Sequence, residues 1–283
     1  MSSQTRELDA LAARARNGDG VALTALIEGI QDDVYRLSLR MLWHPHDAED
    51  AAQEVLFRIV TSISTFRGES SFRTWALRVA SNHLLNVRRS RIEEQRMTFE
   101  SFGQDLADGL VDVPAARSAE PDQRLLEEEV KIGCTRGMLL CLDREERLAY
   151  ILGDVFELRS DEAGLVLDIS PAAFRKRLSR ARERLRSFML AHCGLVSDRA
   201  ACRCARRVTA AVERGRVDPD DLLFAGRGTP GPTALPVLEA VGEMERLHEI
   251  AAIHRTHPTA ETPERLAAEI TSVINMVTRR LLS

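Results

Sequence analysis

The first part of the chain is patterned for amphipathic helices. Between Val21 and Met41 the apolar residues recur at steps of three and four, a spacing that predicts one helix with a buried face. Its apolar positions are Leu23, Leu26, Ile27, Ile30, Val34, Leu37 and Met41. Pro45 interrupts this helix, because proline cannot continue one. Asp47 is expected to cap a second helix, from Ala48 to about Ile63. After a loop at residues 68–71, a third helix is expected over about 72–89.

A second helical pattern lies between Leu158 and Phe188. Ser160 is expected to cap a short helix that ends at Leu167, and Pro171 stands where the next helix begins, a position that suits proline. The buried stripe of that next helix is predicted to be Phe174, Leu178, Ala181, Leu185 and Phe188. Two helices joined by a three-residue turn form the helix-turn-helix pattern, whose second helix enters the major groove of DNA.

Cationic side chains surround this predicted stripe. Seven of them accompany one acid, Glu183: Arg175, Lys176, Arg177, Arg180, Arg182, Arg184 and Arg186. These like charges repel one another, and a phosphate surface would relieve the repulsion. The alternative is a basic surface helix with no specific partner, but the combination of pattern and charge favours DNA binding.

The helix expected over 72–89 is also basic. Residues 71–91 contain Arg73, Arg78, Arg88, Arg89 and Arg91 and no acid. Arg78, Asn82, Asn86 and Arg89 share one helix face, and these residue types suit contacts with guanine and adenine edges. Phe72 and Trp75 would stack on unpaired bases if they are exposed. The spacing fits equally well a solvated basic face with both aromatic residues in the core.

Composition supports an all-α protein. Only 5% of residues are aromatic, which favours helical cores of Leu, Ile, Val and Ala, and the net charge of −4 shows that the chain as a whole is not a polycation. Residues 93–130 hold eleven acids against three bases, with glycines and prolines between them, and are interpreted as an acidic linker at least up to Pro121. No apolar run would span a bilayer and the N-terminus lacks the apolar core of a secretion signal, so a cytoplasmic protein is expected, with no membrane partner and no cofactor.

Residues 192–283 follow as a third block. Helical patterns are expected over 198–214, 233–255 and 263–282, the last with a stripe of Leu266, Ile270, Val273, Val277 and Leu281. Twelve arginines balance twelve acids in this block, and no catalytic constellation stands out. The hypothesis is a regulatory module that packs on the rest of the chain or on a partner.

A cluster of four chemically active residues opens this block: His192, Cys193, Cys202 and Cys204. They could form a tetrahedral zinc set, although the Cys-x-Cys spacing is unusual for one. They could instead include a redox-sensitive thiol pair, since Arg203, Arg206 and Arg207 would lower thiol pKa values. The third interpretation is plain packing. No metal ligand is assigned on this evidence.

Three segments carry a resemblance to a known family. They are Asp47-Ala-Glu-Asp50 followed by Gln53-Glu54-Val55, then Ser71-Phe-Arg-Thr-Trp75 with Arg78, Ala80 and Asn82, and finally Phe174-Arg-Lys-Arg-Leu-Ser-Arg-Ala-Arg182. In this order and spacing they resemble the sigma-70 family of bacterial sigma factors, extracytoplasmic-function group. The resemblance covers about residues 20–190, and it implies a promoter-specificity subunit that has no enzymatic activity of its own.

The resemblance implies four parts: a region 2-like domain (20–92), the acidic linker (93–124), a region 4-like helix-turn-helix domain (125–191) and a helical C-terminal extension (192–283). The implied partners are promoter DNA and core RNA polymerase, through its clamp and flap, with an anti-sigma factor or the extension itself as regulator. Implied clamp-facing residues are Asp50, Gln53 and Glu54. Implied −10 residues are Ser71, Phe72, Arg73, Trp75, Arg78, Asn82 and Asn86. Implied −35 residues are Arg175, Lys176, Arg177 and Arg180.

Two residues depart from the family pattern. Gly164 stands where alanine is usual, at a cost of ~1 kcal/mol in helix propensity. Asp168 replaces the usual turn glycine and is one of the few residues that tolerate a left-handed conformation. Two other functions are possible interpretations of the sequence. A helix-turn-helix regulator that acts apart from polymerase leaves the 71–91 segment unexplained, and a metal-dependent hydrolase in the extension has little support.

Overall fold

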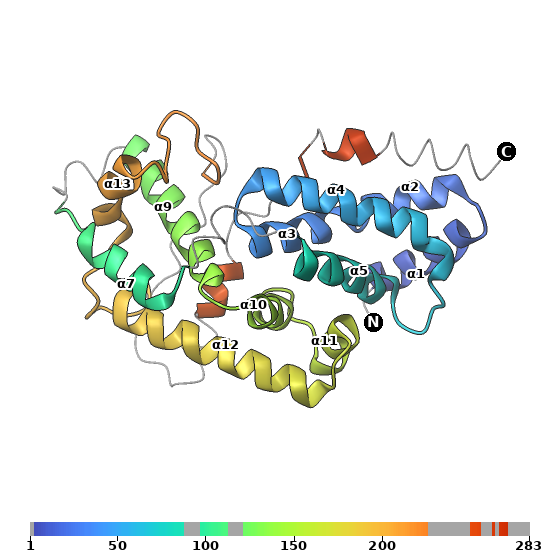
Figure 1. Cartoon of the computed structure of the whole chain (residues 1–283). Coiled ribbons are helices and arrows are strands. Elements are labelled where there is room, and N and C mark those ends of the chain that lie inside the picture. The colour runs from blue at the N-terminus through green and yellow to red at the C-terminus, as the bar shows by residue number, and fades with distance from the viewer. Residues whose placement is uncertain are drawn as a thin grey trace. The chain divides into compact units, whose positions relative to one another are not determined.

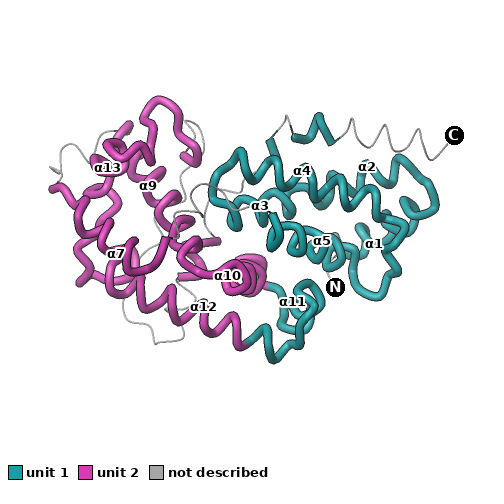
Figure 2. The backbone as a smooth tube through the Cα atoms, in the orientation of Figure 1, with its two compact units in different colours: residues 1–90, 158–175, 260–283 teal, residues 91–157, 176–259 magenta. Residues whose placement is uncertain are grey.

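The structure is a computed structural model that describes residues 3–87, 97–112, 121–225, 250–255, 262–263 and 266–270. All regular secondary structure in this part of the chain is helical, as predicted (Figure 1). None of the helices described there is long and apolar enough to cross a membrane. The chain divides into two units (Figure 2): residues 1–90, 158–175 and 260–283 form unit 1, and residues 91–157 and 176–259 form unit 2.

Unit 1 is built on five N-terminal helices and a short 3₁₀ turn, Ile63–Thr65. The helices are α1 (Ser3–Arg16), α2 (Gly20–Glu28), α3 (Gln31–Leu42), α4 (Pro45–Ser62) and α5 (Phe72–Asn86). Helix α3 packs along α4, and α5 packs against both. Their shared core is apolar and includes the fully buried Leu26, Ile30, Leu37, Met41, Leu56, Ile59, Phe72, Leu77 and Leu84. Helix α11 (Ser160–Leu167) also belongs to this unit and packs against α5.

The single helix predicted over Val21–Met41 is wrong, because the chain breaks at Gly29. Helix α2 ends there, and a Cβ at this position would lie 2.7 Å from the Leu8 side chain, so α1 approaches the backbone closely. Ile30 then joins α2 to α3. The periodicity continues through the break because Ile27, Ile30 and Val34 all enter the same core.

Two expected caps are also wrong. Helix α4 begins at Pro45 rather than after Asp47, and the His44 side chain accepts a hydrogen bond from the His46 N–H at 3.2 Å. The preceding helix ends at Leu42, where Trp43 adopts a positive φ of 71°, and the fixed φ of Pro45 lets it open the next helix. Ser160 is the first residue of α11 and not its cap.

Unit 2 contains the remaining helices. They are α7 (Phe99–Asp108), α9 (Pro121–Leu140), α10 (Arg144–Tyr150) with a π-helical turn (Ile151–Val155), most of α12 (Pro171–His192) and α13 (Cys204–Glu213). Helix α7 lies inside the stretch interpreted as a linker, and Phe102 and Leu106 on it are buried. The acidic composition concealed this short amphipathic helix.

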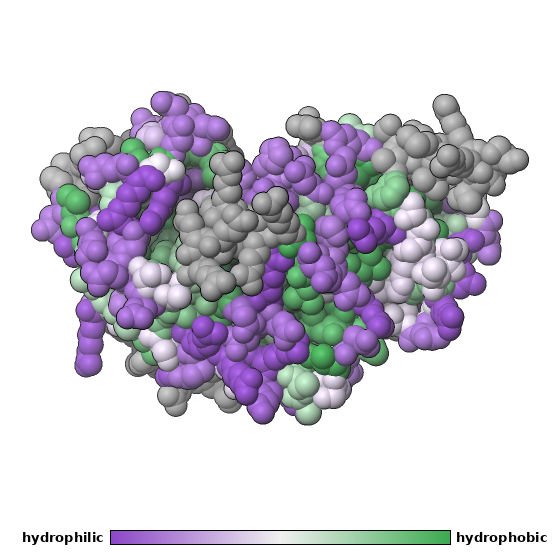
Figure 3. All heavy atoms as spheres, in the orientation of Figure 1, coloured by the Kyte–Doolittle hydropathy of each residue, from purple (hydrophilic) through white to green (hydrophobic). Residues whose placement is uncertain are grey.

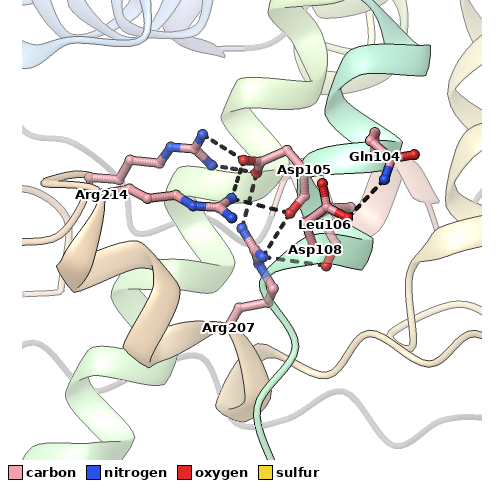
Figure 4. A network of polar contacts seen from close by, with 7 residues as sticks. Gln104, Asp105, Leu106, Asp108, Arg207 and Arg214 are labelled. Atoms are coloured by element: carbon pink, nitrogen blue, oxygen red, sulfur yellow. Dashed lines mark hydrogen bonds and ion pairs between the residues drawn. The ribbon is translucent and has the colours of Figure 1, made fainter.

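The beginning of the extension packs on α9 and α7. Val208 and Ala211 of α13 join Val130 of α9 in a small apolar cluster, together with Val217. The buried Glu129 carboxylate accepts hydrogen bonds from three successive backbone N–H groups, those of residues 223, 224 and 225, at 2.7–3.0 Å. Figure 4 shows Arg207 and Arg214 of the extension converging on Asp105 of α7. Residues 193–225 are therefore an integral part of unit 2.

The helical patterns expected in the extension are met in part. Helix α13 begins at Cys204 rather than at residue 198, because turns occupy residues 194–200. Residues 250–255 and 266–270 are helical, within the expected 233–255 and 263–282 helices. The rest of those two patterns lies outside the described residues, as do Arg88, Arg89 and Arg91.

Candidate nucleic-acid interface

Helix α12 buries the stripe that its sequence predicts. Its residues Phe174, Leu178, Ala181, Leu185 and Phe188 are all buried, which confirms the helical period. Ser170 caps the helix by accepting a hydrogen bond from the Ala173 N–H at 3.1 Å, and Pro171 is its first residue. Hydrophilic side chains gather over the middle of α12 on the face seen in Figure 3.

Six of the seven cations of α12 divide into two groups. Three pair with carboxylates of the same unit: Arg177 with Glu145 at 2.8 Å, Arg182 with Asp154 at 2.5 Å and Arg184 with Glu146 at 2.5 Å. The hydrogen bond to the buried Asp154 raises the pKa of Arg182. Arg175, Lys176 and Arg180 are exposed. The exposed group is available to a phosphate backbone or base edges, while the paired group fixes α12 to α10 and the π-helical turn.

The turn between α11 and α12 explains both departures from the family pattern. Asp168 adopts a left-handed conformation with φ 56° and ψ 42°, as expected for the residue that replaces glycine. A Cβ at Gly164 would lie 2.8 Å from the carbonyl oxygen of Ile169. Glycine is therefore required at residue 164 by the tightness of this turn, which outweighs its poor helix propensity.

Helix α5 presents a polar face that includes Arg78, Asn82 and Asn86, all three exposed. Beside it, α4 and α5 flank an open groove of about 590 Å³ lined by Arg58, Thr61, Ser62, Val79, Asn82, His83, Asn86 and Val87. Burial lowers the pKa of His83, and the charge of Arg58 lowers it further. The groove thus offers amide groups and a cation at one place, which suits a nucleic-acid strand.

The aromatic residues at the start of α5 are mainly structural. Phe72 is completely buried, which favours the second of the two alternatives for this residue, a place in the core. It packs against Phe66 and Trp75, with ring centroids 5.7 Å apart in each case, and Trp75 remains partly exposed. Ser71 caps α5 by accepting a hydrogen bond from the Thr74 N–H at 3.1 Å. Arg73 pairs with Asp33 of α3 at 2.6 Å.

Acids of the helix-turn-helix segment contact the polar face of α5 within unit 1. The Thr74 hydroxyl donates to Glu162 of α11 at 3.1 Å. Asp168 of the turn lies 3.2 Å from the Arg78 guanidinium. Arg78, one of the residues expected to read DNA, and the neighbouring buried Thr74 are thus engaged by carboxylates from elsewhere in the chain. The sequence pattern contained no indication of these contacts, because the partners are about 90 residues apart.

The three residues expected to face polymerase lie on α4. Asp50 and Glu54 are exposed, whereas Gln53 is half-buried and donates a hydrogen bond to Glu269 at 2.6 Å. Upstream, Thr262 donates to Asp32 of α3 through both its N–H and its hydroxyl, at 3.1 and 2.7 Å. Leu266 and Ile270 are buried beside these contacts. A short segment of the extension therefore covers part of the expected docking surface.

The cysteines of the extension line a small cavity in unit 2. Cys193, Cys202 and Cys204 meet there with Cys134 of α9, which sequence analysis had not linked to them. His192 does not line this cavity and instead packs on Phe188, with ring centroids 4.7 Å apart. Among the residues the structure describes, no three His, Cys, Asp or Glu side chains are arranged to hold a metal ion.

Comparison with known proteins accounts for this arrangement. The family model for Sigma-70 region 2 matches residues 26–92, and the one for Sigma-70, region 4 matches residues 132–185. The first match contains α4, α5 and their groove, and the second contains α10, α11 and nearly all of the basic stretch of α12. The chain is a sigma-70 family factor. Both matches end before the extension.

Curated relatives place this sigma factor in the extracytoplasmic-function group. It is similar to the ECF RNA polymerase sigma factor SigW of Bacillus subtilis, with 28% identity over 61% of this chain and 91% of the relative. It is also similar to SigE of Mycolicibacterium smegmatis, with 29% identity over 62% of this chain and 65% of the relative. The ECF RNA polymerase sigma-E factor of Escherichia coli is 26% identical over 65% of this chain and 94% of the relative.

Proposed function

We propose that the chain binds core RNA polymerase in the bacterial cytoplasm and directs it to promoters, where it reads −10 and −35 elements and helps to melt the DNA. The observation that carries this proposal is the pair of DNA-facing elements in one chain: the exposed polar face and groove of α5, and the exposed cations of α12. A helix-turn-helix regulator that acts apart from polymerase would not need the polar face and groove of α5. The protein has no enzymatic activity of its own in this proposal.

The proposed −35 contacts come from α12. Arg175, Lys176 and Arg180 are exposed and contact DNA directly, while Arg177 first has to leave Glu145 or binds DNA beside it. The proposed −10 contacts come from Arg78, Asn82 and Asn86 with Trp75 at the edge of the core. Ser71, Phe72 and Arg73 support α5 through a cap, core packing and an ion pair.

Run-off transcription with core polymerase and a promoter selected by chromatin mapping tests this proposal. Lys176→Ala should weaken promoter binding and reduce the salt slope of log K by about 1, since one phosphate contact is lost. Arg199→Ala, which removes an exposed arginine of the extension, is the control and should leave both unchanged. Failure of the wild-type protein to support transcription from any bound promoter would contradict the function itself.

The extension is proposed to regulate access to α4. The clamp of core polymerase would dock on the surface that includes Asp50, Gln53 and Glu54, and Glu269 of the extension contacts Gln53 on that surface. Polymerase therefore competes with the chain's own C-terminal segment. A separate anti-sigma factor that binds the same surface is a further candidate partner.

The Gln53–Glu269 contact provides the test of this regulation. Glu269→Ala removes the acceptor and should increase the affinity for core polymerase, because less of the covering segment has to be displaced. Glu213→Ala, an exposed acid at the end of α13, serves as the control. Equal affinities for wild type and Glu269→Ala in a titration of core polymerase would refute the competition and leave the sigma function intact.

A further inference from the structure

Four thiols line one small cavity in unit 2. Cys134, Cys193, Cys202 and Cys204 come from α9, the end of α12 and the start of α13, and all four are free. The cavity measures about 40 Å³. A void of that size admits a few water molecules at most, or a molecule of comparable size such as a peroxide.

The backbone brings two of these cysteines into register. Cys193 and Cys202 form an isolated parallel β-bridge, and the Gly194 N–H donates to the Cys202 carbonyl oxygen at 3.0 Å. Paired β-strands lie about 4.8 Å apart. Disulfides join Cα atoms that are usually about 4.4–6.8 Å apart, a range that includes this spacing.

The two thiols differ in their surroundings. Cys202 is half-buried, and although burial raises its pKa, the guanidinium groups of Arg207, Arg203 and Arg206 act in the opposite direction. Cys193 is buried, and burial raises its pKa to about 11, with a contribution from the nearby Cys202. The more accessible Cys202, beside three cations, is therefore the first to react, and the enclosed Cys193 is the partner that resolves the product.

We propose that Cys193 and Cys202 are an oxidative modification site that hydrogen peroxide converts to a disulfide. The Cys202 thiol loses its proton, the thiolate attacks one peroxide oxygen and the O–O bond breaks, which gives a sulfenic acid, and the hydroxide that leaves takes up the proton to form water. The Cys193 sulfur then attacks the Cys202 sulfur, the S–S bond forms, the S–O bond breaks and a second water leaves. The two thiols lose two electrons and two protons in total, and the peroxide is reduced to two water molecules.

The other cysteines are less suited to this chemistry. Cys204 is half-buried like Cys202, but burial together with the charges of Cys193 and Cys202 raises its pKa to about 12. Burial also raises the pKa of Cys134 on α9 well above the ordinary value. A bond between Cys193 and Cys202 ties the end of the DNA-reading helix α12 to the segment that leads into α13. Both cysteines belong to the start of the extension, so oxidation would lock the turn between α12 and α13.

Peptide mapping of the full-length protein under non-reducing conditions tests the proposal. After titration with hydrogen peroxide, mass spectrometry should find the peptides of Cys193 and Cys202 joined, and dithiothreitol should separate them. Cys202→Ser and Cys193→Ser should each abolish this cross-link. Cys141→Ser, which changes a buried cysteine outside the cavity, should retain it.

Three results would overturn the proposal. One is full alkylation of all five cysteines when the folded wild-type protein is treated with peroxide and then unfolded for labelling. Another is a cross-link that involves only Cys134 or Cys204. The third is a stoichiometric metal ion that protects the thiols in the protein as purified. The wild-type map decides the question even if a serine variant fails to fold, and circular dichroism identifies such a variant. None of these results depends on transcription activity.

Discussion

Asp105 is the point at which the extension is most strongly fixed to helix α7. Its carboxylate pairs with Arg207 at 3.0 Å, with Arg216 at 2.5 Å and with Arg214 (Figure 4). Arg207 also donates to the carbonyl oxygens of Asp105 and Leu106, at 2.9 and 3.3 Å. The Arg207 side chain is only 5% exposed. Asp105→Ala would leave this buried cation without a carboxylate.

The loss of unfolding free energy caused by Asp105→Ala follows from the burial of each arginine partner. Removing one member of a buried ion pair typically costs about 3–5 kcal/mol. Arg214 and Arg216 are 34% and 46% exposed, so their pairs contribute up to about 1 kcal/mol each. Because Arg207 retains its backbone acceptors, we expect a loss near the lower end, ~3 kcal/mol of unfolding free energy.

A matched control joins the same two parts of the chain. Arg206 pairs with Asp112 at 2.9 Å, but the Asp112 side chain is 94% exposed. Asp112→Ala should therefore cost at most about 1 kcal/mol. Urea unfolding of the two variants measures the difference, and hydrogen exchange over residues 99–108 and 204–213 shows whether the loss is local. Equal losses from Asp105→Ala and Asp112→Ala would refute the argument that burial decides the cost.

The difference in unfolding free energy between wild type and Asp105→Ala should depend on pH in a defined way. Burial raises the pKa of Asp105, but the hydrogen bond and charge of Arg216, with the charges of Arg207 and Arg214, outweigh it and hold the pKa below 3.8. A carboxylate with a lowered folded-state pKa stabilises the protein above its unfolded pKa and loses that contribution as the pH falls through the folded value. The gap between wild type and Asp105→Ala should therefore be constant from about pH 7 to pH 5 and should shrink below about pH 4. A gap that widens on acidification would contradict the assignment.

Two further substitutions test the helix-turn-helix. Phe174→Ala removes a fully buried ring and should cost about 3–5 kcal/mol in urea unfolding, whereas a loss below about 1 kcal/mol would show that Phe174 is not a core residue. Gly164→Ala should be destabilising by about 1–3 kcal/mol despite the better helix propensity of alanine, because its Cβ would lie 2.8 Å from the Ile169 carbonyl oxygen. A higher melting temperature for Gly164→Ala would mean that the turn can widen.

Local periodicity made part of the fold predictable. The buried face of α12 was predicted residue by residue, because a helix about six turns long averages over local irregularities. The all-α class and the left-handed Asp168 follow from composition and from backbone sterics in the same way. The break at Gly29 was not predictable, since its cause is the approach of Leu8 from another helix.

The contacts that shape the candidate sites depend on distant parts of the chain. Glu269 meets Gln53 across 216 positions, and Cys134 joins Cys193 only when α9 packs against the extension. No periodic pattern encodes such meetings. Phe72 shows the related difficulty: an aromatic residue next to a basic face fits both a stacking platform and a core, and only its complete burial decides between them.

The charge of α12 illustrates why a count of cations overstates DNA binding. Arg177, Arg182 and Arg184 form ion pairs with Glu145, Asp154 and Glu146, and these pairs hold the helix in place. Arg175, Lys176 and Arg180 remain exposed. If each of these three neutralises one phosphate, α12 contributes a salt slope of about −3 rather than the value of about −6 that all seven cations would give. Basic residues on a recognition helix thus serve two purposes, and the presence of a carboxylate partner in the same unit separates them.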